Sequence, residues 1–391
     1  MYMAISEMHQ ADELLLFRKS IQSIAKKLIE PEYSNWEENG IIPRDLWKRL
    51  GDEGLLCIDI PERYGGSGAP FSYSVTVIDE LNRLGYAAIA VNLSVHSNII
   101  AHYILSSGNE EQKNYYLPKM ATGELVGAIA MTEPGAGSDL QGIQTIAQFD
   151  EDQLTYVING SKTFVSNGQL CDFVIVVAKT DLKVPASKGT TLFIVDLSTP
   201  GISRGKNLQK IGLHACDTSE MFLEDVLVPD NAILGELNRG FITLMKELPR
   251  ERLTIAIGAQ GALEGVLDLT IAYVNERAAF GKPISQFQNT RFRIAEMKTE
   301  ARVNRSFVNE CLYLIERGDL DTETASMAKL TCTEAQGKIV DGCLQLFGGY
   351  GYMQEYPISR AFVDARIQRI FGGTSEIMKE IISRGIFGKQ E

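Results

Sequence analysis

The sequence lacks the residue patterns that usually mark metal sites and disulfide frameworks. Its six cysteines are scattered over the chain without a CxxC pair, and its four histidines form no HExxH pattern. We therefore expect no metal site, and we expect the cysteines to be buried free thiols in a reducing compartment. The first residues also lack a basic start followed by an apolar run, so the cytoplasm is the expected location.

Long hydrophobic runs and a basic surface are absent as well. No stretch of about 18 consecutive apolar residues occurs, so no segment is expected to span a membrane. Basic residues number 38 against 50 acidic ones, which gives a net charge of −12 and argues against a nucleic-acid partner. A few local arginines could still bind an anionic ligand on such an acidic protein.

The pattern that is present divides the 391 residues into three segments. Apolar residues recur at helical spacing over residues 1–125, β-branched runs dominate residues 126–235, and helical periodicity returns over residues 236–391. Because strands and helices do not alternate, we expect an α+β fold rather than a Rossmann fold. Within the middle segment, Asn159-Gly160 predicts a tight hairpin turn and Asn167-Gly168 predicts a second turn.

Four glycine-containing motifs could carry function, and each has a structural alternative. Residues 131–139 combine two glycines with the hydroxyls of Thr132 and Ser138. They could approach a phosphate or the edge of a heterocycle, or they could be a turn that ends a strand. The glycines within residues 345–352 follow a helical pattern, and a simple helix C-cap is the favoured interpretation for them alone.

The other two motifs could bind anions. Arg277 and Lys282 could hold a diphosphate, or they could complement the dipole at a helix C-terminus. Residues 369–376 place two glycines before Thr374 and Ser375, so a helix is expected to begin there. Its N-terminus could bind an anion or could simply be capped.

Taken together, in this order and at these spacings, the motifs resemble those of the acyl-CoA dehydrogenase family over essentially the whole chain. The residues that carry the resemblance are 132–139, 159–162, Arg277 with 280–281, Gln345 with 348–349, and 373–374. The resemblance implies an N-terminal helical domain (1–125), a middle β-barrel-like domain (126–235) and a C-terminal four-helix bundle (236–391). It also implies one FAD per subunit, an acyl-CoA substrate, an electron-transfer flavoprotein or similar acceptor, and a homotetramer built as a dimer of dimers.

The resemblance also implies binding roles, one position at a time. Positions that line the flavin are Met131, Thr132, Gly137, Ser138, Phe164 and Ser166, and many members have tryptophan at the position of Phe164. Positions that reach the FAD of a neighbouring subunit are Arg277, Phe280, Gln288, Gln345 and Gly349, and cofactor contacts within the subunit are Thr374 and Glu376. Positions associated with the acyl-CoA are Ser138, Ser187, Arg252, Gly373 and Arg384.

The catalytic base departs from the commonest family pattern. Dehydrogenation needs a base for the α proton, and most members carry a glutamate where this chain has Gly372. The long-chain and isovaleryl types carry it on an earlier helix instead, and Glu251 matches that position. Such a carboxylate in a dry pocket would have a raised pKa, and Gly372 could still donate its backbone N–H to the thioester oxygen. The alternative for Glu251 is a solvated charge paired with Arg250 or Arg252.

The resemblance therefore predicts FAD-dependent conversion of an acyl-CoA to the trans-2-enoyl-CoA, with the flavin accepting the β hydride. An acyl-CoA oxidase or a flavin monooxygenase of the same fold is an alternative. A non-catalytic member that acts in assembly is another, because the carboxylate at position 372 is missing. The floor of the acyl pocket is expected within residues 88–105, whose identities do not reveal the chain length.

Overall fold

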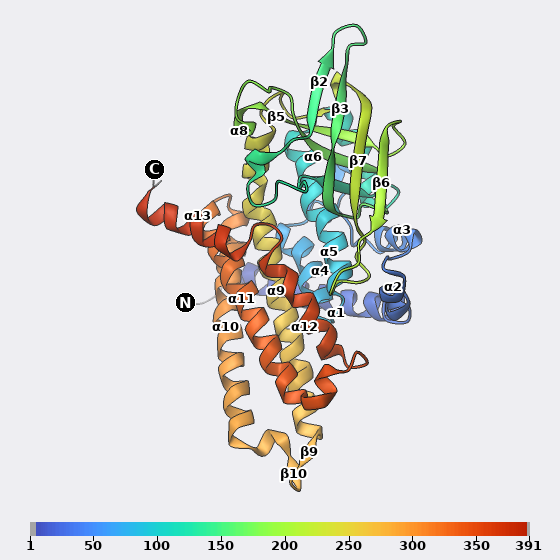
Figure 1. Cartoon of the computed structure of the whole chain (residues 1–391). Coiled ribbons are helices and arrows are strands. Elements are labelled where there is room, and N and C mark those ends of the chain that lie inside the picture. Colours follow the sequence, from blue (N-terminus) through green and yellow to red (C-terminus); the bar gives the residue numbers. More distant parts are fainter. Residues whose placement is uncertain (1–4, 389–391) are drawn as a thin grey trace.

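The computed structural model describes residues 5–388, in which a helical block, a β-sheet and a second helical block follow one another (Figure 1). The expected order of helices, sheet and helices is confirmed. The helices of the first block are α1 (Ile5–Leu28), α2 (Tyr33–Asn39), α3 (Arg44–Asp52), α4 (Phe71–Arg83), α5 (Ala87–Leu93), α6 (Ala101–Ser107) and α7 (Glu110–Ala121). A π-helical turn, η2 (Ser94–Ile100), joins α5 to α6.

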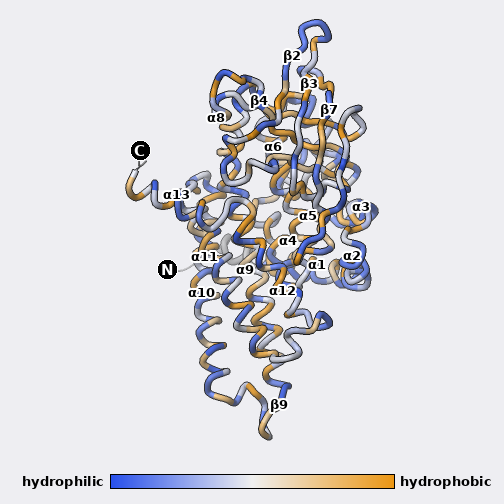
Figure 2. Tube along the Cα trace, in the orientation of Figure 1, coloured by the Kyte–Doolittle hydropathy of each residue, from blue (hydrophilic) through white to orange (hydrophobic). Residues whose placement is uncertain are grey.

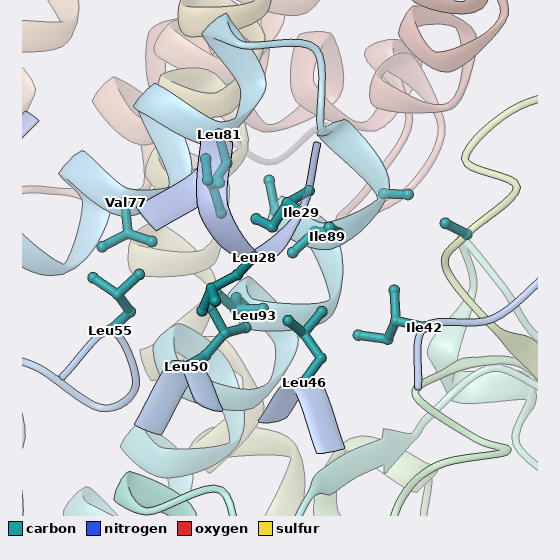
Figure 3. Close-up of a cluster of buried hydrophobic side chains, with 14 of the residues drawn as sticks. Leu28, Ile29, Ile42, Leu46, Leu50, Leu55, Val77, Leu81, Ile89 and Leu93 are labelled. Carbon is teal, nitrogen blue, oxygen red and sulfur yellow. The ribbon is translucent and has the colours of Figure 1, made fainter. Parts of the chain in front are cut away.

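The first block is held together by apolar side chains that recur every three to four residues. Leu46 and Leu50 of α3 are fully buried and lie beside Leu28 of α1 and Leu93 of α5 (Figure 3), and Leu81 of α4 belongs to the same cluster. This spacing places one face of each helix against a shared core. The core fixes α4 and α5, which later form one wall of the site.

The second block is a sheet with the strand order β6-β7-β3-β2-β4-β5-β8, and β1 pairs with β4 beside this path. The strands are β1 (Gly127–Ala130), β2 (Ile146–Asp150), β3 (Thr155–Ser166), β4 (Phe173–Lys179), β5 (Thr190–Asp196), β6 (Ile202–Asn207), β7 (Thr218–Pro229) and β8 (Ile233–Leu234). The short helix α8 (Ala186–Gly189) precedes β5. Strand β3 pairs antiparallel with β2 and β7, so it lies well inside the sheet.

The hairpin predicted at Asn159-Gly160 is wrong, because β3 runs through both residues. Gly160 lies instead at a register shift between β3 and β7, where a Cβ would come within 2.4 Å of Thr145 Oγ1. Glycine is therefore needed at this position for close packing rather than for a turn. The second predicted turn is confirmed, since β3 ends at Ser166 and Asn167 follows with φ 61°.

The third block consists of long helices that extend away from the sheet (Figure 1). Its helices are α9 (Gly240–Glu276), α10 (Gln288–Glu316), α11 (Thr322–Phe347), α12 (Pro357–Ala365) and α13 (Ser375–Phe387). A two-stranded ribbon, β9 (Ala278–Ala279) and β10 (Lys282–Pro283), lies at the far tip between α9 and α10. Helix α9 packs against α4 as well as against α10 and α11, so it connects the two helical blocks.

Two helical stretches of the described chain, Ala87–Ser107 and Gly240–Glu276, are long and apolar enough to cross a membrane by length and composition alone. Their most apolar windows are 78% and 56% buried inside the protein. Apolar residues recur along much of α9 in Figure 2, in keeping with its place between two helical blocks. Their hydrophobicity is thus explained by packing in the core.

Candidate active site

A cavity of about 260 Å³ lies where the three blocks meet. Helices α4 and α5 with η2 form one wall, the loop after β1 and strand β3 form a second, and α9 with the segment 368–373 forms a third. The predicted floor segment 88–105 contributes several of the lining residues. Eight predicted site residues line this cavity: Met131, Thr132, Gly137, Phe164, Ser166, Glu251, Gly372 and Gly373.

Glu251 is a buried carboxylate on α9, with only 6% of its surface exposed. The Tyr103 hydroxyl donates a 2.8 Å hydrogen bond to Glu251 Oε1. Burial raises the pKa of Glu251 to about 7, although the hydrogen bond from Tyr103 opposes the rise. The alternative of a solvated surface charge is wrong, because Arg250 instead pairs with Asp59 and the Arg252 guanidinium donates to Ser326.

Gly372 and Gly373 form a turn on the cavity lining that only glycine fits easily. Their φ values are +64° and +97°, and a Cβ on Gly372 would lie 2.4 Å from Ile255 Cδ1. The buried Lys329 ammonium donates a hydrogen bond to the Gly373 carbonyl oxygen, and burial followed by the Arg252 charge lowers the pKa of Lys329 to about 8. The Lys329 ammonium therefore stabilises the conformation of this turn through the Gly373 carbonyl.

After this turn, Thr374 begins α13 as predicted. Its side chain accepts a hydrogen bond from the backbone N–H of Ile377.

The loop after β1 is held in place by a buried ion pair. Lys162 Nζ lies 2.7 Å from Glu133 Oε1, and both side chains are almost fully buried. Glu133 also accepts hydrogen bonds from the backbone N–H groups of Gln144 and Thr145. Lys162 is on β3, so the pair ties the loop that contains Met131 to the strand that contains Phe164.

The remaining predicted substrate and cofactor residues near this end lie outside the cavity lining. Ser138 is exposed beside the lining residue Gly137, and Ser187 lies on α8. Arg252 is only 4% exposed and its Nε has no hydrogen-bond partner among the described residues. Glu376 and Arg384 lie on α13, where Arg384 pairs with Glu380.

A second group of predicted residues gathers at the far tip of the third block. Arg277, Gln345 and Gly349 line a pocket of about 600 Å³ there. Phe280 is 95% exposed next to the β9–β10 ribbon, and Gln288 is the first residue of α10. The structure thus gathers Arg277, Gln345 and Gly349 on one pocket, with Phe280 and Gln288 on the adjoining ribbon and helix end, and none of the five lines the cavity that contains Glu251.

Three family models match consecutive parts of this chain. They describe the N-terminal domain of acyl-CoA dehydrogenase at residues 11–124, the middle domain at residues 128–226, and the C-terminal domain at residues 238–387. The chain belongs to the acyl-CoA dehydrogenase family. Its fold is accordingly the acyl-CoA dehydrogenase fold, with N-terminal helical, middle β and C-terminal helical domains.

Individual relatives agree with the family models. The chain is 46% identical to the mitochondrial long-chain specific acyl-CoA dehydrogenase of Sus scrofa over 372 residues, which cover 95% of this chain and 86% of that one. Among solved structures it resembles an acyl-CoA dehydrogenase from Geobacillus kaustophilus, with a TM-score of 0.93, 45% identity, and coverage of 96% of this chain and 98% of the other. A glutaryl-CoA dehydrogenase from Mycobacterium smegmatis in complex with FADH2 has a TM-score of 0.91 at 29% identity, with 97% and 95% coverage.

The acyl-CoA dehydrogenase described here is therefore an FAD-dependent oxidoreductase that dehydrogenates acyl-CoA thioesters. An oxidase, a monooxygenase or a non-catalytic assembly protein is not favoured by these relatives.

The cavity mouth of this acyl-CoA dehydrogenase fits a flavin. Phe164 lines the cavity, yet its surface is 66% exposed and its φ is +58°, an uncommon conformation for an aromatic residue. A Cβ built on Gly135 or Gly137 would meet no atom within 4 Å, so the backbone of this loop is open to a ligand. An accessible aromatic ring, open backbone and the nearby hydroxyls of Thr132 and Ser166 suit a planar heterocycle.

Four residues that shape this site were missed by reasoning from the sequence. Glu133 and Lys162 lie inside the motifs that carry the family resemblance, and that position is the one signal by which they could have been found. Tyr103 and Lys329 had no such signal, because each reaches its partner only through the packing of separate helices.

Proposed function

We propose that Glu251 is the base that removes the α proton of the acyl-CoA. The observation that supports it most directly is a buried carboxylate on the lining of the same cavity as Gly372, a residue that cannot supply one. A pKa of about 7 makes this carboxylate a stronger base than an exposed glutamate while keeping much of it ionised near neutral pH.

Gly372 on the cavity lining and Lys329 behind it are proposed to bind and orient the thioester. The backbone N–H of Gly372 is proposed to donate to the thioester oxygen, where negative charge develops as the α proton leaves. Lys329 holds this turn through the Gly373 carbonyl, and its charge favours an anion at the thioester. When FAD is bound by the loop after β1 and by Phe164, it supplies the acceptor for the β hydride.

We propose long-chain acyl groups as the substrate class. The cavity continues along α4, α5 and η2, where apolar side chains such as Ile78, Val91, Val95 and Ile99 line it. The 46% identity to a long-chain specific acyl-CoA dehydrogenase supports the same choice. A panel of saturated acyl-CoAs ranked by kcat/KM tests it, and a maximum at four or fewer acyl carbons would contradict it.

We also propose a homotetramer that works in the cytoplasm and passes its electrons to an electron-transfer flavoprotein or a similar acceptor. Support for assembly comes from the bundle tip, where Arg277 forms no ion pair with any described residue and Phe280 is almost fully exposed. Such groups suit contact with the FAD of a neighbouring subunit. The sequence contains no GxGxxG motif, which supports an acceptor other than NAD.

Moving the carboxylate from α9 to the turn tests the role of Glu251. Glu251→Gly should abolish flavin reduction by an acyl-CoA, and adding Gly372→Glu should recover part of the rate, because both positions face the same cavity. Recovery should be limited by Ile255, whose Cδ1 lies 2.4 Å from a Cβ at position 372. Adding Ile255→Ala should therefore raise the recovered rate further.

The control is Ile255→Ala in the otherwise unchanged enzyme, which shows what the smaller side chain does by itself. Anaerobic stopped-flow spectroscopy of the flavin measures all four proteins. A Glu251→Gly enzyme that reduces its flavin at the original rate would place the base elsewhere.

A further inference from the structure

Tyr103 and Glu251 meet across two helices that are far apart in the sequence. The Tyr103 hydroxyl donates to Glu251 Oε1 at 2.8 Å, and Tyr103 is fully buried. Glu251 lines the cavity, whereas Tyr103 is not among the lining residues. Glu251 Oε2 accepts no hydrogen bond from the described part of the chain. One carboxylate oxygen is thus anchored within the protein, and the other is left available to a substrate.

The residues that precede Tyr103 and Glu251 in the sequence, His102 and Arg250, both contact Asp59. Asp59 Oδ2 lies 2.9 Å from His102 Nε2 on α6 and 3.2 Å from Arg250 Nη1 on α9. The Asp59 side chain is only 5% exposed, and the Arg250 guanidinium also lies over the Phe71 ring at 4.4 Å. Although burial raises it, the His102 and Arg250 groups hold the pKa of Asp59 below its ordinary value. Asp59 therefore links α6 to α9 beside the hydrogen bond between Tyr103 and Glu251.

We propose that Tyr103 is a positioning residue for the base: it fixes the Glu251 carboxylate through Oε1 so that Oε2 faces the α carbon, and the Asp59 link holds α6 and α9 at the separation this requires. The inference rests on the proposed role of Glu251 as base. A hydroxyl that donates to a carboxylate also favours its ionised form. Tyr103 thereby counteracts part of the effect of burial.

Few charged groups act on the ionisation of Glu251, so the single hydrogen bond from Tyr103 should change its pKa. Besides Tyr103 from α6, the groups that act on its ionisation are Glu247 and Arg252 on α9 itself. Glu247 raises the pKa of Glu251 and Arg252 lowers it, so these two charges oppose one another. Removing the Tyr103 hydroxyl should therefore shift the ionisation of the base to higher pH.

Tyr103→Phe in the FAD-loaded enzyme tests the proposal. The rate of anaerobic flavin reduction by dodecanoyl-CoA is measured between pH 5.5 and pH 9. The midpoint of the pH profile should rise by about one pH unit, because a hydrogen bond to a charged group is lost. From a pKa of about 7, this rise lowers the ionised fraction of Glu251 at pH 7, and with it the rate, by about fivefold. The KM for dodecanoyl-CoA and the FAD content should stay unchanged.

Tyr64→Phe is the matched control. Tyr64 is also a buried tyrosine of the first block, and its hydroxyl donates to the Glu110 carboxylate at 3.0 Å, away from the cavity lining. This variant should keep the original pH profile. If both variants lose stability equally but only Tyr103→Phe moves the midpoint, a purely structural role for Tyr103 is excluded.

Asp59→Asn tests the second half of the proposal. It should slow flavin reduction in the original enzyme but add little in the Tyr103→Phe background, because both changes act on the same carboxylate. Fully additive losses would overturn the role of Asp59. A Tyr103→Phe enzyme with the original midpoint and rate, beside an inactive Glu251→Gly enzyme, would overturn the role of Tyr103 alone. An active Glu251→Gly enzyme would overturn the base and this inference together.

Discussion

The cavity beside Glu251 and the tip around Arg277 differ in how much of their surroundings a single chain supplies. At the cavity, three blocks of the same chain converge, and each charged group there is buried and held by specific contacts. At the tip, Arg277 lies near the Tyr350 ring at 5.3 Å but forms no ion pair among the described residues. One chain thus provides the cavity walls and the proposed base, whereas the proposed role of the tip needs a second subunit.

This difference separates the consequences of mutation. A change at the cavity should alter the chemical step without releasing the cofactor, because the flavin loop is anchored independently by Glu133 and Lys162. A change at the tip should release the cofactor without altering the chemistry of the molecules that keep it. Substitutions in each region test whether the two consequences are independent.

The largest effect is expected for Glu251→Gln. This substitution keeps the size of the side chain and can still accept the Tyr103 hydrogen bond, but it cannot take a proton. A positioned general base contributes about 10²–10⁴-fold, so flavin reduction by dodecanoyl-CoA should fall at least that far while FAD content stays constant. Stopped-flow absorbance measures the rate, and loss of FAD from this variant would contradict the separation of the two regions.

The second effect is a change in how the free energy of unfolding depends on pH in Glu251→Gln. The pKa of Glu251 is raised by burial from its ordinary value of 4.5 to about 7. Below pH 4.5 Glu251 is neutral in both the folded and the unfolded protein, so its burial carries no ionisation penalty. As the pH rises from 4.5 to about 7 and above, the unfolded protein ionises Glu251 more easily than the folded protein does. The free energy of unfolding therefore falls by about 3 kcal/mol over this range. Glu251→Gln should therefore gain stability relative to the original enzyme as the pH rises from 4.5 to 8.

Urea unfolding of both FAD-loaded proteins at several pH values measures this difference. The comparison between the two proteins is essential, because burial also raises the pKa of Asp364 to about 7 and affects both equally. A stability difference that does not change with pH would mean that Glu251 ionises normally in the folded protein.

A smaller effect is expected for Arg277→Ala at the tip. Loss of a charge-assisted bond to a diphosphate costs about 1.5–3 kcal/mol, which corresponds to a ten- to hundredfold weaker retention of FAD. Flavin content after extensive dialysis measures it, with Arg49→Ala on α3 as a control that removes an exposed arginine elsewhere. Unchanged flavin content would remove the reason to assign the tip to a neighbouring subunit's cofactor.

Much of the site could be predicted from the sequence because the residues that indicate it lie within short, continuous motifs. The glycine motifs and the N-cap at Thr374 are short patterns. The structure places Met131, Thr132, Gly137, Phe164 and Gly372 on one cavity. The proposal of Glu251 as the base rests on the glycine at position 372, where most members of the family carry a glutamate. That Glu251 is buried with a raised pKa agrees with that reading.

Other features depended on contacts that no local pattern encodes. Asn159-Gly160 has the sequence of a hairpin, but pairing of β3 with β2 and β7 on both sides keeps the strand extended through it. Tyr103 and Glu251 are separated by 148 positions, and only the packing of α6 beside α9 brings them together.

By itself, the sequence determined the family, the order of the three blocks and which carboxylate is free to act as base, because these depend on residue type and spacing. Only the tertiary structure decided which oxygen of Glu251 is anchored, which cation holds the Gly372–Gly373 turn, and that the tip lies away from the cavity. The physical reason is that burial and side-chain contacts between distant segments set a group's charge and orientation, and both arise only when the helices pack.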